Sequence, residues 1–288
     1  MIGEDPFGIF INVNNTVYAY DRSSSGRIRM WLNGNVSALQ TISTNSPYAH
    51  GLFVTDNGDI YVDSNNGPRT QKWIKEKNIS VTEMHVSTHG CVGIFVDINN
   101  TLYCSLWTIH QVVAKLVTNG TSTIKIVAGT GCAGSAPNML NSPHGIFVDS
   151  QFRLHVAECY NHRIQRFEWG QLNGTTVAGN DTSPSISLNC PTGVVLDGNG
   201  FLFIADRYNS RIIGQDSNGF RCVAGCSGNG SGSCQLNWPQ TIHFDSYGNM
   251  FVTDRSNDRI QKFLFATNSC SECCAIHLYT DNDIFCCS

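Results

Sequence analysis

Short apolar runs alternate with polar turns along this chain, and one such pattern recurs six times. A glycine opens a run of apolar residues that ends at Asp or Asn, as in Gly145-Ile146-Phe147-Val148-Asp149. The opening positions are Gly8, Gly51, Gly93, Gly145, Gly193 and, in place of a sixth glycine, Thr241. Asp and Asn end a strand because they favour turns. A spacing of 42 to 52 residues between openings is typical of the four-stranded blades of a β-propeller.

Three further strands are predicted in the repeats. The second begins nine positions after the opening, as in 202–205 and 250–253, and is rich in β-branched and aromatic residues. The third follows a polar loop, as in 163–167, and a fourth ending in Val-Ala-Gly is visible between some repeats. We therefore predict an all-β fold, a six-bladed β-propeller over residues 1–263. Residues 264–288 form a cysteine-rich tail, in which 275–279 is the candidate for the last blade's fourth strand.

An acid, an asparagine and an arginine recur in the loop after the second strand of the last three repeats. These triplets are Glu158, Asn161 and Arg163; Asp206, Asn209 and Arg211; and Asp254, Asn257 and Arg259. A catalytic group is needed once, whereas a stabilising network is needed in every blade, so recurrence indicates a structural role. We predict that each arginine binds loop carbonyls and the acid of its own or an adjacent blade.

These motifs resemble NHL repeats. The resemblance rests on the Pro-x-Gly-[Ile/Val]-x-[Val/Leu]-Asp opening, the [Asp/Glu]-x-x-Asn-x-Arg-[Ile/Val] loop and the Val-Ala-Gly strand, and it extends over about residues 6–263. In the first three repeats it is weaker, because Ser64 and Leu106 replace the loop acid and Gly67 and Ile109 replace the loop asparagine. The resemblance implies a six-bladed propeller, which agrees with the number of repeats.

The amino-acid composition limits the kinds of partner that the protein can bind. Charged residues make up 14% of the chain, hydrophobic residues make up 41%, and the net charge is −4. This balance argues against nucleic acid as a partner, because phosphate backbones require clustered Lys and Arg. No apolar run approaches the about 18 residues that a membrane span needs. Only five residues precede Pro6, so no signal segment fits there, and either the start is truncated or export is not signalled.

Thirteen cysteines and eight Asn-x-[Ser/Thr] sites favour an oxidising, extracellular setting. The glycosylation sites are Asn14, Asn35, Asn78, Asn99, Asn119, Asn173, Asn180 and Asn229. Cys159 lies in a loop of the fourth repeat and Cys190 lies just before the fifth, on the same predicted face, so we predict a disulfide between them, with two unpaired loop cysteines as the alternative. Cys222 and Cys226 are candidates for a local bridge, with Cys234 close behind.

The tail cysteines raise the question of a zinc site. They are Cys270, Cys273, Cys274, Cys286 and Cys287. Paired Cys-x-x-Cys motifs bind zinc, but the second pair here is adjacent and His277 is the single imidazole between the pairs. We favour a disulfide module or a disordered end.

His50, His144 and Gln240 stand directly before the openings of the second, fourth and sixth repeats. In a propeller this position lies near the axis, so alternate blades direct the three side chains toward one point, as a catalytic zinc requires of its ligands. The pattern resembles the NHL-type amidating lyases of peptide hormone processing, whose channel histidines hold a metal. The resemblance implies ligands at His50 and His144 alone, since Gln240 is a poor zinc ligand. We favour satisfied loop histidines, and we predict that His243, in an apolar column, packs in the core.

The functional prediction is a noncatalytic binding or scaffolding propeller that presents loops to a protein, peptide or glycan, with no cofactor. The chain has no Gly-x-Ser-x-Gly, phosphate-loop or His-Glu-x-x-His motif. One alternative is a lyase or hydrolase of the amidating-lyase type with a channel metal, zinc or calcium. Another is a recognition propeller related to tripartite-motif ubiquitin ligases. Fold alone does not decide among them.

Overall fold

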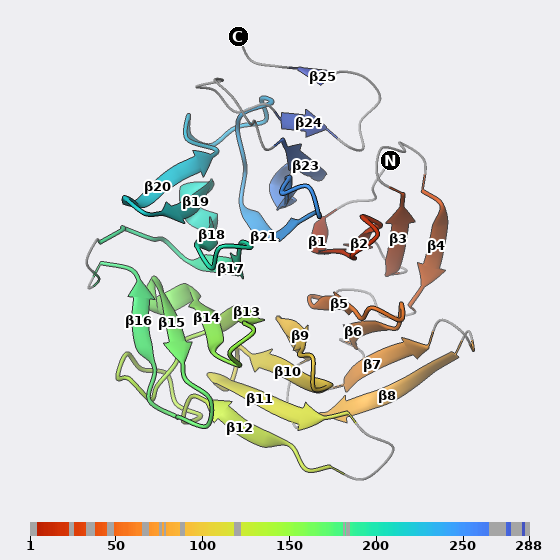
Figure 1. The fold of residues 1–288 in the computed structure, drawn as a ribbon, viewed down its shortest axis with the longest axis vertical. Helices are drawn as coiled ribbons and strands as arrows, with labels where there is room; N and C mark the ends of the chain where they lie inside the picture. The colour runs from red at the N-terminus through yellow and green to blue at the C-terminus, as the bar shows by residue number, and fades with distance from the viewer. Residues whose placement is uncertain are drawn as a thin grey trace. The chain divides into compact units, whose positions relative to one another are not determined.

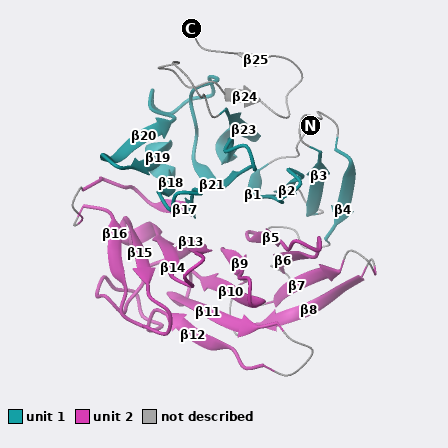
Figure 2. Cartoon of the chain, viewed as in Figure 1, with its two compact units in different colours: residues 1–48, 195–288 teal, residues 49–194 magenta. Residues whose placement is uncertain are grey.

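The computed structural model describes most of the chain, in two compact units. The described residues are 5–22, 26–32, 38–44, 49–64, 69–74, 77, 79–86, 90–117, 122–180, 182 and 185–264, with the backbone of 275–277 and 284–285. One unit contains residues 1–48 and 195–288, and the other contains residues 49–194 (Figure 2). We number the sheets in chain order as blades 1 to 6 (Figure 1).

Blades 2, 3 and 4 lie in the unit of residues 49–194, and each has four antiparallel strands. Their strands are β5 (Leu52–Val54), β6 (Ile60–Ser64), β7 (Arg69–Ile74) and β8 (Ile79–His85); β9 (Ile94–Val96), β10 (Thr101–Leu106), β11 (Gln111–Leu116) and β12 (Lys125–Ala128); and β13 (Pro143–Val148), β14 (Leu154–Glu158), β15 (Arg163–Phe167) and β16 (Thr175–Ala178). Every strand pairs with the next one along the chain.

Blades 1, 5 and 6 have the same meander order, and β17 alone begins in the residues of the other unit. Their strands are β1 (Pro6–Ile11), β2 (Val17–Asp21), β3 (Arg27–Trp31) and β4 (Gln40–Ser43); β17 (Pro191–Leu196), β18 (Leu202–Asp206), β19 (Arg211–Asp216) and β20 (Gly219–Ala224); and β21 (Pro239–Phe244), β22 (Met250–Asp254), β23 (Arg259–Phe263), β24 (Ala275–His277) and β25 (Ile284–Phe285).

The fold class is therefore the all-β, six-bladed propeller that the sequence predicted. Helical residues in the described chain are confined to three single-turn 3₁₀ helices, η1 (Cys159–Asn161), η2 (Arg207–Asn209) and η3 (Arg255–Asn257). Each occupies the loop between the second and third strands of its blade. No helix among the described residues is long and apolar enough to cross a membrane.

The tail supplies the fourth strand of blade 6. The backbone of β24 pairs antiparallel with β23, with Lys262 opposite Ile276, and β25 adds a fifth strand. The sequence placed this strand at 275–279, and its last two residues lie outside the described chain, as do the tail cysteines.

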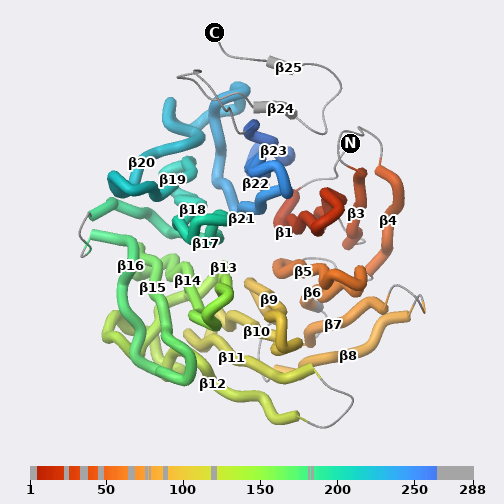
Figure 3. The backbone as a smooth tube through the Cα atoms, viewed as in Figure 1, coloured from red at the N-terminus to blue at the C-terminus, as the bar shows by residue number. Residues whose placement is uncertain are grey.

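Close approach of neighbouring blades explains the repeated glycine. A Cβ atom on Gly93 would lie closer than 3.0 Å to the backbone oxygen of His144, and one on Gly145 would be equally close to the oxygen of Thr192. Real Cβ atoms essentially never approach so closely. The first strands of neighbouring blades, such as β9 and β13 (Figure 3), therefore meet backbone to backbone. The third and fourth repeats open on glycine because a side chain has no room there.

The cores lie between blades. In the unit that holds both ends of the propeller sequence, Ile9 and Trp31 of blade 1 pack in one cluster with Phe251 and Ile260 of blade 6. The ring of His243, also in blade 6, lies 4.6 Å from the ring of Phe10. Burial of that imidazole lowers its pKa to about 4, so His243 is neutral at pH 7. The first and last repeats thus share one apolar core, and the half-buried His243 contacts Phe10 between the same two blades.

Candidate functional site

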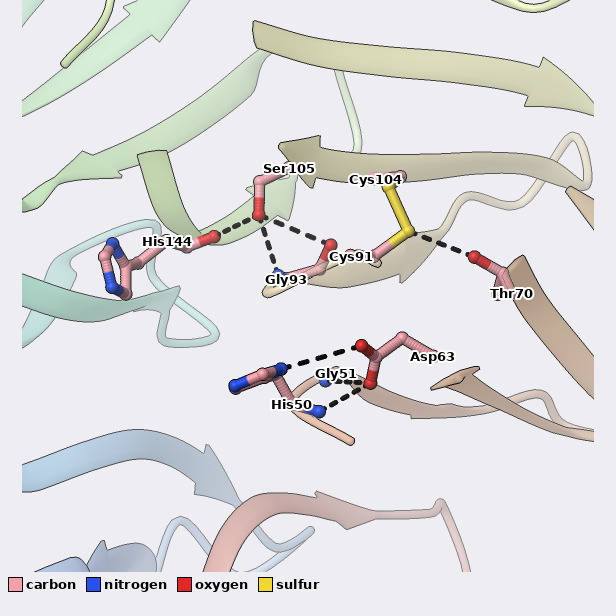
Figure 4. The surroundings of a disulfide bond; sticks show 9 residues. All are labelled: His50, Gly51, Asp63, Thr70, Cys91, Gly93, Cys104, Ser105 and His144. Carbon is pink, nitrogen blue, oxygen red and sulfur yellow. Dashed lines mark hydrogen bonds and ion pairs between the residues drawn. A yellow bond between two sulfur atoms is a disulfide. The ribbon is translucent and has the colours of Figure 1, made fainter. Parts of the chain in front are cut away.

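His50 lies against a buried carboxylate (Figure 4). Its Nδ1 is 3.6 Å from Oδ2 of Asp63, a residue with 0% exposure on the second strand of the same blade. The other carboxylate oxygen of Asp63 accepts the backbone N–H groups of His50 at 2.5 Å and Gly51 at 3.3 Å. Asp63 therefore holds the backbone at the blade opening and faces the imidazole at the same time.

Ser105 takes the equivalent position in blade 3 and links that blade to His144 (Figure 4). Its Oγ accepts the Gly93 N–H at 2.7 Å and donates to the backbone oxygen of His144 at 2.5 Å. The His144 Nδ1 lies 2.9 Å from the carbonyl oxygen of Ser142. Since a carbonyl only accepts, this Nδ1 carries the proton and the lone pair is on Nε2.

Gln240 belongs to the other unit. Its side chain is 3% exposed, and no hydrogen-bond partner reaches its Oε1 within the described residues. In the same blade, Thr253 makes the contact that Asp63 and Ser105 make in blades 2 and 3, because its Oγ1 accepts the Thr241 N–H at 2.9 Å. A buried amide oxygen without a partner is costly, so Gln240 marks a position where a donor would be favourable.

A metal held by His50, His144 and Gln240, as the amidating-lyase resemblance suggested, stays a prediction. Nowhere in the described chain do three His, Cys, Asp or Glu side chains come together as metal ligands would. His50 turns its Nδ1 toward Asp63, and His144 commits its Nδ1 to a carbonyl. The His144 imidazole is thus held by a hydrogen bond, and the His50 imidazole lies beside a buried carboxylate.

The sequence reasoning missed Asp63, Ser105 and Thr253. Each lies twelve residues after the opening position of its repeat, near the end of an otherwise apolar second strand. A polar residue recurring in a buried column was the signal that could have revealed them, because buried polar groups require partners. In blades 4 and 5 this column holds Ala157 and Ala205.

The loop triplets hold the loop that precedes their own blade. Glu158 accepts the Asn161 Nδ2 and Arg163 Nε groups, both at 2.6 Å, and the Asn141 backbone N–H at 2.9 Å. Arg163 also donates to the carbonyl oxygens of Ser135 and Met139. Burial raises the pKa of the Glu158 carboxyl, and the Arg163 guanidinium opposes that rise.

Blade 6 repeats this arrangement closely. Asp254 accepts Asn257 Nδ2 at 2.8 Å, Arg259 Nε at 2.6 Å and Gln261 Nε2 at 2.9 Å. Arg259 donates to the carbonyl oxygens of Ser231, Gly232 and Gln235. In blade 5, Asp206 accepts Asn209 and Arg211, both at 2.9 Å. All of these contacts join residues of the chain to one another, as a network that holds loops does.

Three disulfides lie within the described part of the chain. Two join the pairs that the sequence suggested, Cys159 with Cys190 and Cys222 with Cys226. The third, between Cys91 and Cys104, was not predicted; it ties the start of blade 3 to its second strand, and Thr70 of blade 2 donates its hydroxyl to the Cys91 sulfur (Figure 4). Cys132 is a free, exposed thiol.

A side-chain acceptor joins each described blade junction in the same way. The residue directly after the position of the loop asparagine adopts a left-handed conformation. Its side chain accepts the backbone N–H of the residue before the next blade's proline. The pairs are His110 with Ser142, His162 with Cys190, Ser210 with Trp238, and Asp258 with Asp5. All eight residues have positive φ. The junction is therefore a repeated structural element.

A second contact at the same junctions differs in chemistry from one to the next. The residue after the loop acid meets the residue before the next blade's proline: Cys159 is disulfide-bonded to Cys190. Arg255 pairs with Asp5, with 2.5 Å from Nε to Oδ1. Between these two junctions in the sequence, Arg207 stacks over the Trp238 ring at 5.0 Å.

The Arg207 junction presents large aromatic rings to solvent. The Arg207 guanidinium also lies 5.3 Å from the ring centre of Tyr208, and the rings of Tyr208 and Trp238 are 5.6 Å apart with a tilt of 59°. Tyr208 is 43% exposed and Trp238 is 42% exposed. We call Arg207, Tyr208 and Trp238 the aromatic corner. Sequence reasoning did not find it, although a Trp directly before a blade-opening proline was a visible signal.

Comparison with known proteins places the chain among propellers. Residues 188–214 match the NHL repeat family, and no curated protein matches the chain. The structure resembles virginiamycin B lyase from Staphylococcus aureus, with a TM-score of 0.63, 14% identity and coverage of 97% of this chain and 85% of that one.

Two further solved structures are binding or assembly proteins. An auxiliary nutrient binding protein from Bacteroides thetaiotaomicron VPI-5482 gives a TM-score of 0.67 at 17% identity, covering 91% of this chain and 69% of that one. A nidogen/laminin complex gives 0.60 at 19% identity, covering 73% and 75%. At these identities the likeness is one of fold, so activity must be argued from the residues of this chain.

Proposed function

We propose that this chain is a noncatalytic binding propeller whose loops hold a protein, peptide or glycan. The observation that carries the proposal is the aromatic corner, where Arg207 supports two exposed rings that no packing requirement of the blade explains. Trp, Tyr and Arg are the residues that contribute most to binding at protein surfaces. Among the neighbours in fold, a nutrient binding protein and a nidogen/laminin complex are consistent with such a role.

We also propose that the protein works outside the reducing cytoplasm, as a glycoprotein. The three disulfides support this, because disulfides persist in oxidising compartments. The glycosylation sites within the described residues all have an exposed asparagine: Asn14, Asn99, Asn173, Asn180 and Asn229. Asn35, Asn78 and Asn119 lie outside the described residues.

A lyase is the second candidate, and one observation favours it. His50 beside the buried Asp63 is an imidazole oriented by a carboxylate, which is a pairing that general bases use. Virginiamycin B lyase has a similar fold. The recognition half of a tripartite-motif type ubiquitin ligase remains a third candidate, with the negative net charge arguing against RNA as its target.

Binding of the purified, oxidised protein to arrays of glycans and of extracellular proteins tests the leading proposal. We expect saturable binding that survives His50→Ala and His144→Ala, since neither histidine belongs to the aromatic corner. Metal analysis of the same preparation addresses the lyase. Stoichiometric metal that disappears in both histidine variants, together with no saturable binding, would replace the binding propeller with the lyase.

A further inference from the structure

We propose that Asn173 carries an N-linked glycan whose first N-acetylglucosamine packs on the exposed ring of Trp169. The inference rests on the proposed glycoprotein nature of the chain and gives one glycosylation site a structural role. Asn173 is exposed and begins the sequence Asn173-Gly174-Thr175, which meets the requirement for N-glycosylation. Trp169 stands four residues earlier in the same loop and is 65% exposed.

The loop that holds both residues is longer than the blade requires. Strands β15 and β16 leave residues 167–174 between their last paired residues. In blade 5, the equivalent strands β19 and β20 leave residues 217–218 between theirs. A two-residue connection therefore satisfies the fold at this place. The longer loop of blade 4 adds two exposed apolar side chains, Trp169 and Leu172, and the glycosylation site beside them.

The turn between β13 and β14 supports the Trp169 ring. The ring centre of Phe152 lies 5.7 Å from that of Trp169, with a tilt of 59°, and we call these two residues the aromatic pair. Phe152 has a φ of 61°, a left-handed conformation that is unfavourable for a bulky residue. The other five blades place Gly or Asn, which tolerate this conformation, at the same turn position: Asn15, Gly58, Asn100, Gly200 and Gly248. The contact with Trp169 accounts for a phenylalanine in blade 4.

Backbone hydrogen bonds hold the loop in place. The Gln171 N–H donates to the Glu168 carbonyl oxygen at 3.0 Å and closes a turn. The Gly174 N–H donates to the carbonyl oxygen of Pro137 at 2.8 Å, outside the loop. Asn173 directly precedes this anchored glycine. The attachment point and the aromatic pair therefore belong to one ordered part of blade 4.

N-glycosylation supplies a group that can cover the aromatic pair. The new bond joins Nδ2 of Asn173 to C1 of the sugar, while the lipid pyrophosphate of the oligosaccharide donor leaves and the amide loses a proton. One face of the sugar ring consists of C–H groups, so laying it on an indole removes apolar area from water while the hydroxyl groups stay hydrated. The covalent link keeps the sugar at a high effective concentration beside the ring.

The other glycosylation sites lack this arrangement. Within the described residues, none of them has an exposed aromatic residue within four positions on either side: Asn14, Asn99, Asn180 and Asn229. Asn99 is therefore a matched control, since it is an exposed sequon asparagine in a turn without an exposed ring. Tyr247 is the complementary control, because its ring is 70% exposed in a turn without a sequon.

Hydroxyl-radical labelling with mass spectrometry tests the proposal. The protein is produced in secretory cells under a mannosidase inhibitor, and endoglycosidase H then trims each glycan to its first sugar. Glycopeptide mass spectrometry measures the occupancy of Asn173. We expect Trp169 to be oxidised at least about twofold more slowly in the trimmed wild type than in Asn173→Gln, because the sugar covers one face of the indole. Asn99→Gln should leave the oxidation of Trp169 unchanged.

Thermal unfolding of the same preparations gives a second readout. Loss of the Asn173 sugar should lower the unfolding midpoint by about 2 °C in the wild-type background. It should have no effect in Trp169→Ser, where the sugar has no ring to cover. In Tyr247→Ser the full shift should persist. Thr175→Ala, which removes the sequon and keeps the asparagine, serves if Asn173→Gln fails to fold.

Three results overturn the inference. One is an unoccupied Asn173 in a protein whose other sequons carry glycans, which leaves the glycoprotein proposal intact. Another is equal oxidation of Trp169 with and without the sugar. The last is an equal shift of the unfolding midpoint in the wild-type and Trp169→Ser backgrounds. A protein with no glycan at any sequon would instead overturn the glycoprotein proposal, and this inference with it.

Discussion

Asp258 accepts a hydrogen bond from the backbone N–H of Asp5 at 2.7 Å, across 253 residues of sequence. The same bond joins Ser210 to Trp238 between blades 5 and 6. Blade 6 therefore meets blade 1 as blade 5 meets blade 6. The Arg255–Asp5 ion pair and the core shared by Ile9 and Phe251 add to this junction. Propeller closure here uses a repeated junction as well as the strand that the tail adds.

We expect Asp258→Gly to lower the free energy of unfolding by about 1 kcal/mol, the typical worth of one hydrogen bond. Glycine keeps the left-handed conformation, φ 51° at this position, so the loss reports the acceptor and not backbone strain. Asp258→Asn, which retains both an acceptor oxygen and tolerance of this conformation, should stay within about 0.5 kcal/mol of wild type. Urea unfolding measures both, and a glycine variant as stable as wild type would refute the role of this bond.

Repetition determined how much the sequence could reveal. The opening glycines and the loop triplets were predictable because each recurs at a fixed position, and the structure gives both a physical reason: inner strands meet backbone to backbone at Gly93, and Arg259 holds loop carbonyls. Features that occur once were predictable only in part, because the Cys159–Cys190 disulfide was found and the Cys91–Cys104 disulfide was not. Cys91 and Cys104 lie in one of the weaker repeats. Periodicity defines columns of residues without saying which columns touch, so the Arg207–Trp238 contact needed the structure.

The loop network should contribute to stability and not to binding. Arg259→Ala leaves Asp254, which is 0% exposed, without its ion pair, and removing one partner of a buried pair costs about 3 kcal/mol. Arg211→Ala should cost less, because the Arg211 side chain is 27% exposed against 9% for Arg259. Arg259→Lys keeps the charge but loses the fork of donors. Its loss of stability should therefore lie between the losses of Arg211→Ala and Arg259→Ala. Urea unfolding measures the free energy of unfolding of each variant and so gives the order of their losses. An Arg259→Ala variant as stable as wild type would contradict the prediction.

The disulfides should differ in how much each contributes to the free energy of unfolding. Cys159–Cys190 closes a sequence separation of 31 residues, and Cys222–Cys226 closes one of 4. Loop-closure entropy favours the longer bridge, so replacing the Cys159–Cys190 pair by alanines should cost about 3 kcal/mol and the shorter pair about 2 kcal/mol or less. Alkylation before reduction should label the exposed Cys132 and spare Cys159. The reverse order of stabilities would show that native-state strain, and not chain entropy, dominates.

His243 should make the protein acid-sensitive well above the pH at which carboxylates titrate. Burial lowers its pKa to about 4 from the ordinary 6.5, so the unfolded chain takes up a proton between these values while the folded chain does not. Stability is therefore full above about pH 6.5, falls as the pH drops below it, and reaches its new level below about pH 4.

Within that window each pH unit changes the free energy of unfolding by at most about 1.4 kcal/mol. We expect a loss of about 1–2 kcal/mol between pH 6.5 and 5. His243→Phe, which keeps an aromatic ring against Phe10 and restores the residue common to this column, should remove that loss. Urea unfolding at a series of pH values compares the two proteins. If the wild-type and phenylalanine proteins lose stability in parallel from pH 6.5 to 5, the acid sensitivity arises elsewhere.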